Sequence, residues 1–237
     1  MCGKADLDGT DKSIFDFSMN SAKELAGKGE IDPLENIKGA PVWQLREALD
    51  NLVGQNQQNA SKQFYEALGA NLSSEIKPWR HVFAIDDPRQ SMQGDCITSS
   101  HFCGWDTAGR ILIHLLWNLP SSGLDRGNWQ GKAWDWENRG VLKPFDQHEF
   151  VTEKNWTKTE FTDKGAVYYP YACLQFQCNV HISLHGCFGS TDYWPKEGTG
   201  LIHYAASNNI ILLFPFVKEC YDTKGKTGPN FATKKGI

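Results

Sequence analysis

Two stretches of the chain decide its fold: residues 178–187, CNVHISLHGC, and residues 210–214, IILLF. In the first stretch apolar residues alternate with polar ones, which is typical of a β-strand whose two faces differ. The second is a continuous apolar run, which is typical of a strand covered on both faces. Residues 199–207, between them, predict a helix. A strand–helix–strand unit of this kind predicts a parallel pair of strands with a right-handed crossover, and therefore an α/β fold.

The rest of the sequence predicts more elements of both kinds. Asp106 is expected to cap a helix at 107–119 that carries a broad apolar stripe. At 237 residues the chain can build one good-sized core, so we expect a single domain over 1–237. We expect residues 1–20 to be irregular. Further strands are expected at 40–46, 76–85, 145–150 and 165–169, and further helices at 22–26 and 56–68.

Charge and motif content exclude several classes of protein. The chain has 24 Lys and Arg against 28 Asp and Glu, a net charge of −4, and no basic block, so we expect no nucleic-acid partner. No apolar run approaches the ~20 residues that a membrane-spanning helix needs. Neither H-E-x-x-H nor paired C-x-x-C spacing occurs, nor a phosphate-binding glycine loop, so we expect no metal and no cofactor.

The seven cysteines are many for a cytosolic protein of this size. Cys96 and Cys103 enclose one short loop and Cys173 and Cys178 another, and each pair could close a ring worth about 2–3 kcal/mol. Buried free thiols are the alternative. Three N-x-S/T sequons, at Asn59, Asn71 and Asn155, add to the case for secretion and glycosylation. Because the first residues hold no apolar signal region, we expect the signal peptide to lie upstream of this chain.

Two short motifs could carry chemistry. The tripeptide His185-Gly186-Cys187 follows a predicted strand, and a turn of this kind can offer backbone N–H groups to an oxyanion. Alternatively, Gly186 only permits the turn and Cys187 only forms a crosslink. Asp50 follows a predicted strand, where a carboxylate can orient a catalytic histidine. Taken alone, an aspartate at such a place is more often a loop or helix-cap residue. No G-x-S-x-G nucleophile motif occurs in the sequence.

Three tryptophans lie in a stretch rich in Gly and charge, which we expect at the surface: Trp129, Trp134 and Trp136. Exposed aromatic rings there could stack on sugars or on a polyester. The alternative is that they fold inward as a local cluster.

Several of these stretches, in order, resemble secreted poly(3-hydroxybutyrate) depolymerases, which are α/β-hydrolases. Residues 178–187 resemble that family's C-x-V-H-V-A-L-H-G-C strand, and residues 205–215, AASNNIILLFP, resemble its W-A-D-x-N-N-I-I-V-L-Y-P segment. Residues 103–109, CGWDTAG, are similar to its C-x-Y-D-x-A-G helix start. Residues 145–150, FDQHEF, and 231–236, FATKKG, match as well, so the resemblance covers about residues 18–237.

The resemblance implies an incomplete α/β-hydrolase domain with circularly permuted strand order and a mostly parallel sheet flanked by helices. The segment with the catalytic serine would lie upstream, and the last helix would be missing. It implies that Asp50 is the triad acid and that the Cys187 N–H lines the oxyanion hole. It places His185 and Tyr221 at the substrate, Tyr221 standing where the family has tryptophan. The implied disulfides are Cys96–Cys103, Cys173–Cys178 and Cys187–Cys220.

One departure bears on activity. Without gaps from Ile76, the family's catalytic histidine falls at Asp86, and a carboxylate is a much weaker base than imidazole at neutral pH. His81 lies five residues earlier, and strand alternation would turn it to the opposite face. We therefore expect a polyester-esterase relative that has little activity as it stands. The alternative is a secreted binding protein without catalysis, for polyester, glycan or a protein. Without the serine strand, apolar strand surface should be exposed and the chain should associate.

Overall fold

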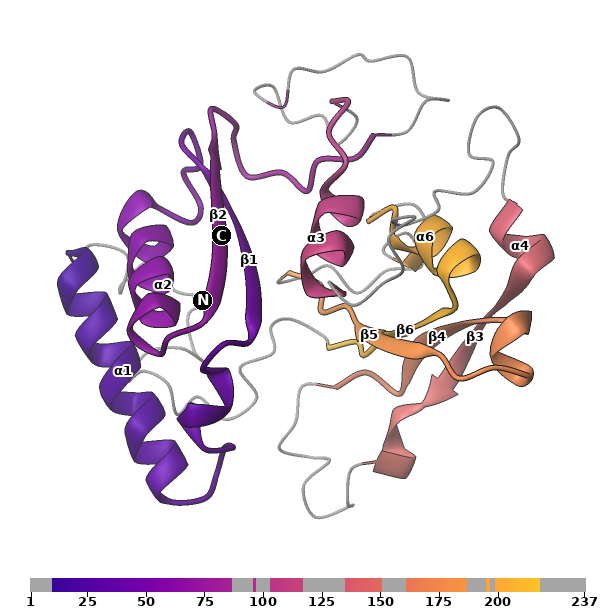
Figure 1. Ribbon diagram of the computed structural model, residues 1–237, viewed down its shortest axis with the longest axis horizontal. Coiled ribbons are helices and arrows are strands. Elements are labelled where there is room, and N and C mark those ends of the chain that lie inside the picture. Colours follow the sequence, from indigo (N-terminus) through magenta and orange to yellow (C-terminus); the bar gives the residue numbers. More distant parts are fainter. Residues whose placement is uncertain are drawn as a thin grey trace.

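The computed structural model describes residues 10–86, 96, 103–116, 135–150, 161–186, 195–196 and 199–217. Its helices and strands form two groups (Figure 1). The first group is a two-stranded sheet with helices on one face, and the second is a four-stranded sheet with its own helices. Helix α3 (Thr107–Leu115) contacts both groups, since it packs on β1 of the first and on α6 of the second. The described residues thus have an α/β architecture.

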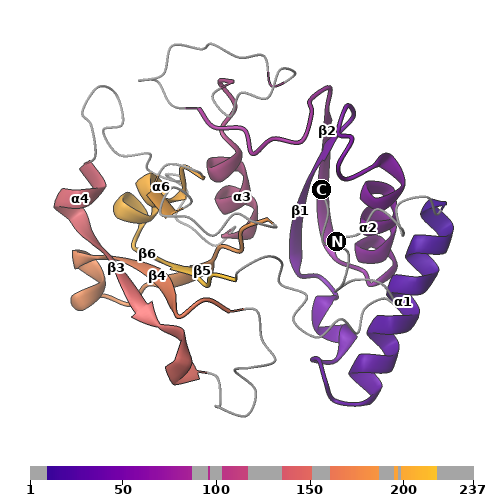
Figure 2. The same cartoon turned by 180° about the vertical axis from the view of Figure 1, so that it is seen from behind.

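The first group runs through α1 (Asp11–Gly27), η2 (Leu34–Ile37), β1 (Pro41–Glu47), α2 (Gln55–Ala67) and β2 (Asn71–Lys77). Strands β1 and β2 pair in parallel over their full length, so that Glu47 lies opposite Lys77. Helix α2 packs on the sheet and α1 packs on α2, as Figure 2 shows from behind. The predicted strand at 40–46 and the predicted helix at 56–68 are confirmed to within one residue.

Two predictions in this group are wrong. Residues 11–20 are helical rather than irregular, because the Thr10 side chain caps α1 by accepting a hydrogen bond from the Ser13 N–H at 3.2 Å. The strand expected at 76–85 instead occupies 71–77. Pro78 follows it directly, and proline has no N–H to continue a strand ladder, so the chain leaves the sheet there.

The second group contains α4 (Asp135–Arg139), β3 (Gly140–Asp146), η3 (Gln147–Phe150), β4 (Lys164–Pro170), η4 (Tyr171–Leu174), β5 (Asn179–Ile182), α6 (Leu201–Asn208) and β6 (Ile210–Phe214). The order of strands in its sheet is β3-β4-β6-β5. Strands β5 and β6 are parallel and α6 lies between them in the chain, which confirms the predicted strand–helix–strand unit.

The expectation of a mostly parallel sheet is not met in the described residues. Strands β3 and β4 pair antiparallel, and so do β4 and β6, so only two of the four strand pairings are parallel. The apolar pattern that predicts a strand is the same in both directions, so it cannot distinguish the two kinds of pairing. Residues 147–150, expected to extend a strand, form the 3-10 turn η3 instead.

The main core lies between α3, α6 and the four-stranded sheet. Tyr168, Tyr204, Leu212 and Phe214 are among its fully buried members. Trp136 is also buried there, edge-on to Tyr168 at a ring-centroid distance of 5.8 Å, and its carbonyl oxygen accepts a hydrogen bond from the Tyr168 hydroxyl at 2.9 Å. Trp136 therefore folds inward, as in the second of the two interpretations of the tryptophan-rich stretch, and is not exposed at the surface. Trp129 and Trp134 lie outside the described residues.

Strand β5 and the two residues after it, Ser183 and Leu184, have one face whose apolar side chains are exposed. Val180 is 61% exposed, and Ile182 and Leu184 are each 56% exposed, whereas the alternating Ser183 and His185 are buried. Within the described residues β5 pairs only with β6, and β1 pairs only with β2. This exposure agrees with the expectation of uncovered apolar strand surface.

Two of the three expected disulfides are present. Cys96 bonds Cys103 with a Cα–Cα distance of 5.4 Å, and Cys173 bonds Cys178 with a Cα–Cα distance of 5.7 Å. The expected Cys187–Cys220 pair lies outside the described residues. No helix among the described residues combines the length and the apolar character needed to cross a membrane.

Candidate functional site

Three ionisable side chains come together at one edge of the β1–β2 sheet. Because β1 and β2 are parallel and in register, both strands end at this edge, and the segments that follow them lie side by side. Backbone hydrogen bonds join the two segments, from the Ala48 N–H to the Lys77 oxygen at 2.7 Å and from the Leu49 N–H to the Trp79 oxygen at 2.8 Å. The first segment carries Asp50, and the second carries His81.

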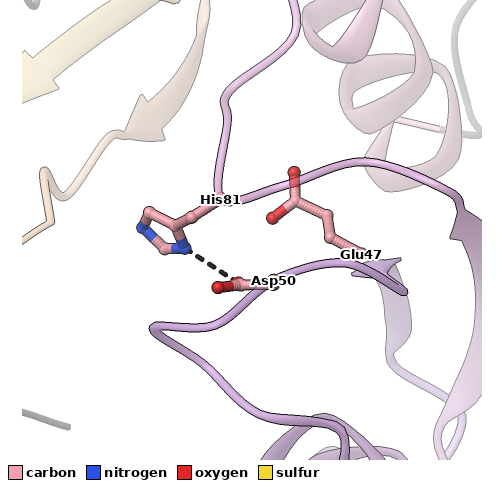
Figure 3. A group of neighbouring side chains, drawn as sticks. All are labelled: Glu47, Asp50 and His81. Carbon is pink, nitrogen blue, oxygen red and sulfur yellow. Dashed lines mark hydrogen bonds and ion pairs between the residues drawn. The ribbon is translucent and has the colours of Figure 1, made fainter. Parts of the chain in front are cut away.

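Asp50 and His81 form a hydrogen-bonded pair. The His81 Nδ1 atom lies 2.9 Å from Asp50 Oδ2, and the second ring nitrogen is on the side away from the carboxylates (Figure 3). The other carboxylate oxygen, Oδ1, accepts hydrogen bonds from the N–H groups of Leu52 at 2.7 Å and Val53 at 2.9 Å. The Asp50 side chain is only 2% exposed, whereas that of His81 is 52% exposed. A buried, held carboxylate therefore faces an accessible imidazole.

Glu47 is the third member of the cluster. It is the buried last residue of β1, and its Oε1 atom accepts a hydrogen bond from the Val82 N–H at 3.1 Å. Burial raises the pKa of Glu47 to about 7; the bond from Val82 opposes this rise, and the Asp50 charge adds to it. Burial therefore favours the protonated form of the Glu47 carboxyl.

Helix α2 fixes the turn that carries Glu47 and Asp50. Gln58 accepts from the Glu47 N–H at 2.8 Å and donates to the carbonyl oxygens of Glu47 at 3.1 Å and of Val53 at 2.7 Å. Gln55 also donates to the Glu47 carbonyl, at 2.8 Å. These bonds satisfy backbone groups of the last strand residue and of the turn after it, so α2 holds the turn in place.

The His81 segment is held from its other side. Val82 and Ala84 are buried against Cys96, which is bonded to Cys103. The Arg80 N–H also donates to the Cys96 carbonyl oxygen at 3.2 Å. The Cys96–Cys103 disulfide therefore lies next to the site and supports the segment that carries His81.

Chemically, this arrangement suits proton transfer. A carboxylate that accepts the Nδ1–H bond selects the imidazole tautomer whose other nitrogen, Nε2, is free to take a proton. His81 does not point to the opposite face, as strand alternation predicted, because the strand ends at Lys77 and alternation does not reach residue 81. Pro78 was the signal in the sequence: it places His81 in a loop at the same sheet edge as Asp50. Asp86, where the resemblance places the family's histidine, lies five residues beyond His81, at the end of the described range 10–86.

The same three groups are spaced closely enough for a cation, since one ligand atom from each lies within 4.8 Å of the others. Their atoms already have donors or partners, however. Asp50 accepts three N–H bonds, counting His81, and Glu47 accepts the bond from Val82. The absence of a metal stays a prediction of the sequence.

His185, which the resemblance places at the substrate, is buried in the structure. It is 4% exposed, and its Nε2 atom accepts a hydrogen bond from the Val217 N–H at 3.1 Å. Its Nδ1 atom lies 2.5 Å from the Gly186 carbonyl oxygen. Both ring nitrogens thus contact backbone atoms. Cys187 and Tyr221, expected at the oxyanion hole and the substrate, lie outside the described residues.

The sequons differ in accessibility. Asn59 lies within α2, is half-buried, and accepts a hydrogen bond from Arg46 Nη1 at 2.8 Å. Asn71 is the exposed first residue of β2. It borders a groove of about 650 Å³ between α3 and the β1–β2 sheet, which does not include the Asp50–His81 pair. Asn155 lies outside the described residues.

Comparison with known proteins shows a likeness of structure. The chain is similar to the crystal structure of PHB depolymerase from Penicillium funiculosum, with a TM-score of 0.64 and 23% identity over 84% of this chain. It is also similar to a PHB depolymerase complexed with an R3HB trimer, with a TM-score of 0.60 and 22% identity over 79% of this chain. The chain spans about 60% of the first structure and 57% of the second. No family model matches the chain, and no curated protein matches it. The chain therefore has a PHB depolymerase-like α/β fold.

Proposed function

We propose that this chain supplies the acid and the base of a serine-esterase site of the polyester-depolymerase lineage. The observation that carries the proposal is the Asp50–His81 pair, with a buried carboxylate held by two backbone N–H groups and an exposed imidazole. In a serine hydrolase such a pair removes the proton from the nucleophile and returns it to the leaving group. His81, rather than Asp86, takes the role of the base.

The nucleophile would come from a segment that this sequence does not contain. The sequence has no G-x-S-x-G motif, and the chain spans about 60% of a depolymerase. Loss of the serine alone removes on the order of 10⁶ of kcat in a triad enzyme. The chain as given is therefore expected to have little or no esterase activity. Its substrates would be 3-hydroxyalkanoate esters, because one similar depolymerase is complexed with an R3HB trimer.

We also propose that the chain is secreted, in keeping with its disulfides.

The proposal is tested with a chimera. The part of the Penicillium funiculosum depolymerase that has no counterpart in this chain is joined to it, and hydrolysis of a short 3-hydroxybutyrate ester is measured. We expect saturable activity that is lost in the His81→Ala and Asp50→Ala variants and kept in Asp86→Asn. Activity that survives His81→Ala in the folded chimera would refute the assignment.

A non-catalytic binding role is the second candidate. The sequence favours it through the missing nucleophile motif and through Asp86, which stands at the family's histidine position. Trp136 is buried in the core and so gives no support to an aromatic binding patch. Retention of the chain on polyhydroxybutyrate granules, compared between wild type and a Trp129→Ala/Trp134→Ala variant, tests this role. Equal retention would remove the aromatic patch from consideration.

A further inference from the structure

Glu47 has no part in the acid–base roles proposed above, yet it is buried against both members of the pair. Its carboxyl group accepts the N–H of Val82, the residue after His81. One of its carboxyl oxygens also lies within 4.8 Å of an Asp50 carboxylate oxygen and of a His81 ring nitrogen. Its main chain is bound by two glutamines of α2. A buried carboxyl in such surroundings is expected to have a specific partner for each oxygen.

We propose that Glu47 is a positioning residue for the Asp50–His81 pair: in its protonated form it donates a hydrogen bond to Asp50 and accepts one from Val82. Two carboxyl groups this close cannot both be ionised without strong repulsion, and a shared proton removes it. The bond to Val82 holds the backbone beside the imidazole, while the bond to Asp50 holds the carboxylate. The inference rests on the proposed function of the pair, and it adds a third residue to it.

The proposal makes the geometry of the pair depend on pH. Glu47 has its pKa raised by burial to about 7, so the shared proton is lost as the pH rises through neutrality. Asp50 and His81 are the titratable groups that act on Glu47. From α2, the side chains at this end of β1 are the neutral amides of Gln55 and Gln58. Ionised Glu47 then repels Asp50 and loosens its hold on the imidazole.

Glutamine is the appropriate replacement, because its amide keeps both bonds. The side-chain oxygen can accept from Val82 and the NH₂ group can donate to Asp50, at every pH. Leucine has a similar volume but can make neither bond. Glu66→Gln serves as the matched control, since Glu66 is an exposed carboxylate of α2 that pairs with Lys62.

The experiment follows the Nδ1–H proton of His81 by NMR in chains labelled with ¹⁵N-histidine, with the signal assigned through a His81→Gln variant. As the pH rises from 6 to 9, we expect the exchange of this proton with water to become faster in wild type and in Glu66→Gln. The factor of acceleration in these two chains should be about five times the factor in Glu47→Gln. In Glu47→Leu we expect fast exchange at both ends of this range.

Equal exchange in wild type and Glu47→Gln at pH 9 would overturn the proposal, and so would a Glu47→Gln variant that behaves like Glu47→Leu. A shift of the signal on addition of Zn²⁺ at micromolar concentration would also overturn it, in favour of a cation between the three groups. The readout needs no esterase activity. Failure of the chimera and failure of this proposal are therefore distinguishable.

Discussion

Replacement of Glu47 by glutamine should change how the stability of the chain depends on pH. The carboxyl of Glu47 has a pKa of about 7 in the folded chain, raised by burial, against 4.5 for the ordinary group. Folding therefore favours the protonated form. The stabilisation is complete below pH 4.5 and is lost as the pH rises through about 7. At 1.36 kcal/mol for each pH unit, the wild type should lose about 3 kcal/mol of unfolding free energy across this window through Glu47 alone.

Urea unfolding at pH 5 and pH 9, followed by tryptophan fluorescence, measures this loss. Glutamine resembles the protonated acid, so at pH 5 the Glu47→Gln variant should match wild type within about 1 kcal/mol. At pH 9 it should be the more stable of the two by about 3 kcal/mol. Glu66→Gln, on the exposed face of α2, should follow wild type at both pH values. If wild type and Glu47→Gln lose the same free energy from pH 5 to pH 9, then Glu47 does not carry the shifted proton and the reasoning fails.

Three further predictions concern the fold and the surface. Val180, Ile182 and Leu184 are each a little over half exposed, so covering them would recover about 1 kcal/mol apiece. We expect the chain to associate, and we expect the variant with threonine at all three positions to be more monomeric by light scattering. If that variant associates equally, this face does not cause the association. A Cβ at Gly165 would lie 2.6 Å from a Phe145 ring carbon and 2.8 Å from the Phe214 carbonyl oxygen, so Gly165→Ala should cost about 1–3 kcal/mol in thermal unfolding. Gly27→Ala, with nothing within 4 Å of its Cβ, is the control, and equal losses would contradict the crowding. In a secretory host, Asn71→Gln should remove a glycan detectable by mass, whereas Asn59→Gln should leave the mass of the glycans unchanged.

Local patterns in the sequence determined several elements correctly. The alternation at 180–184 and the apolar run at 210–214 gave strands β5 and β6, and the stretch between them gave α6. Asp106 caps α3 as expected, because its side chain accepts the Gly109 N–H at 2.9 Å. The two short-range cysteine pairs also form. In each of these cases the deciding contacts lie within a few residues or within one repeating pattern, so a single sequence contains the information.

The tertiary structure alone decided the composition of the site. Glu47, Asp50 and His81 are separated by up to 34 positions, and they meet because two parallel strands end in register at one edge of a sheet. The sequence pattern did not show that the second strand ends at Lys77, so strand alternation turned His81 away from Asp50. The resemblance, aligned without gaps from Ile76, put the family's histidine position at Asp86. Nor did the sequence pattern show that the His185 ring is buried, with a backbone partner at each ring nitrogen. Register, pairing direction and burial arise from contacts between distant segments, and no local spacing of residues encodes them.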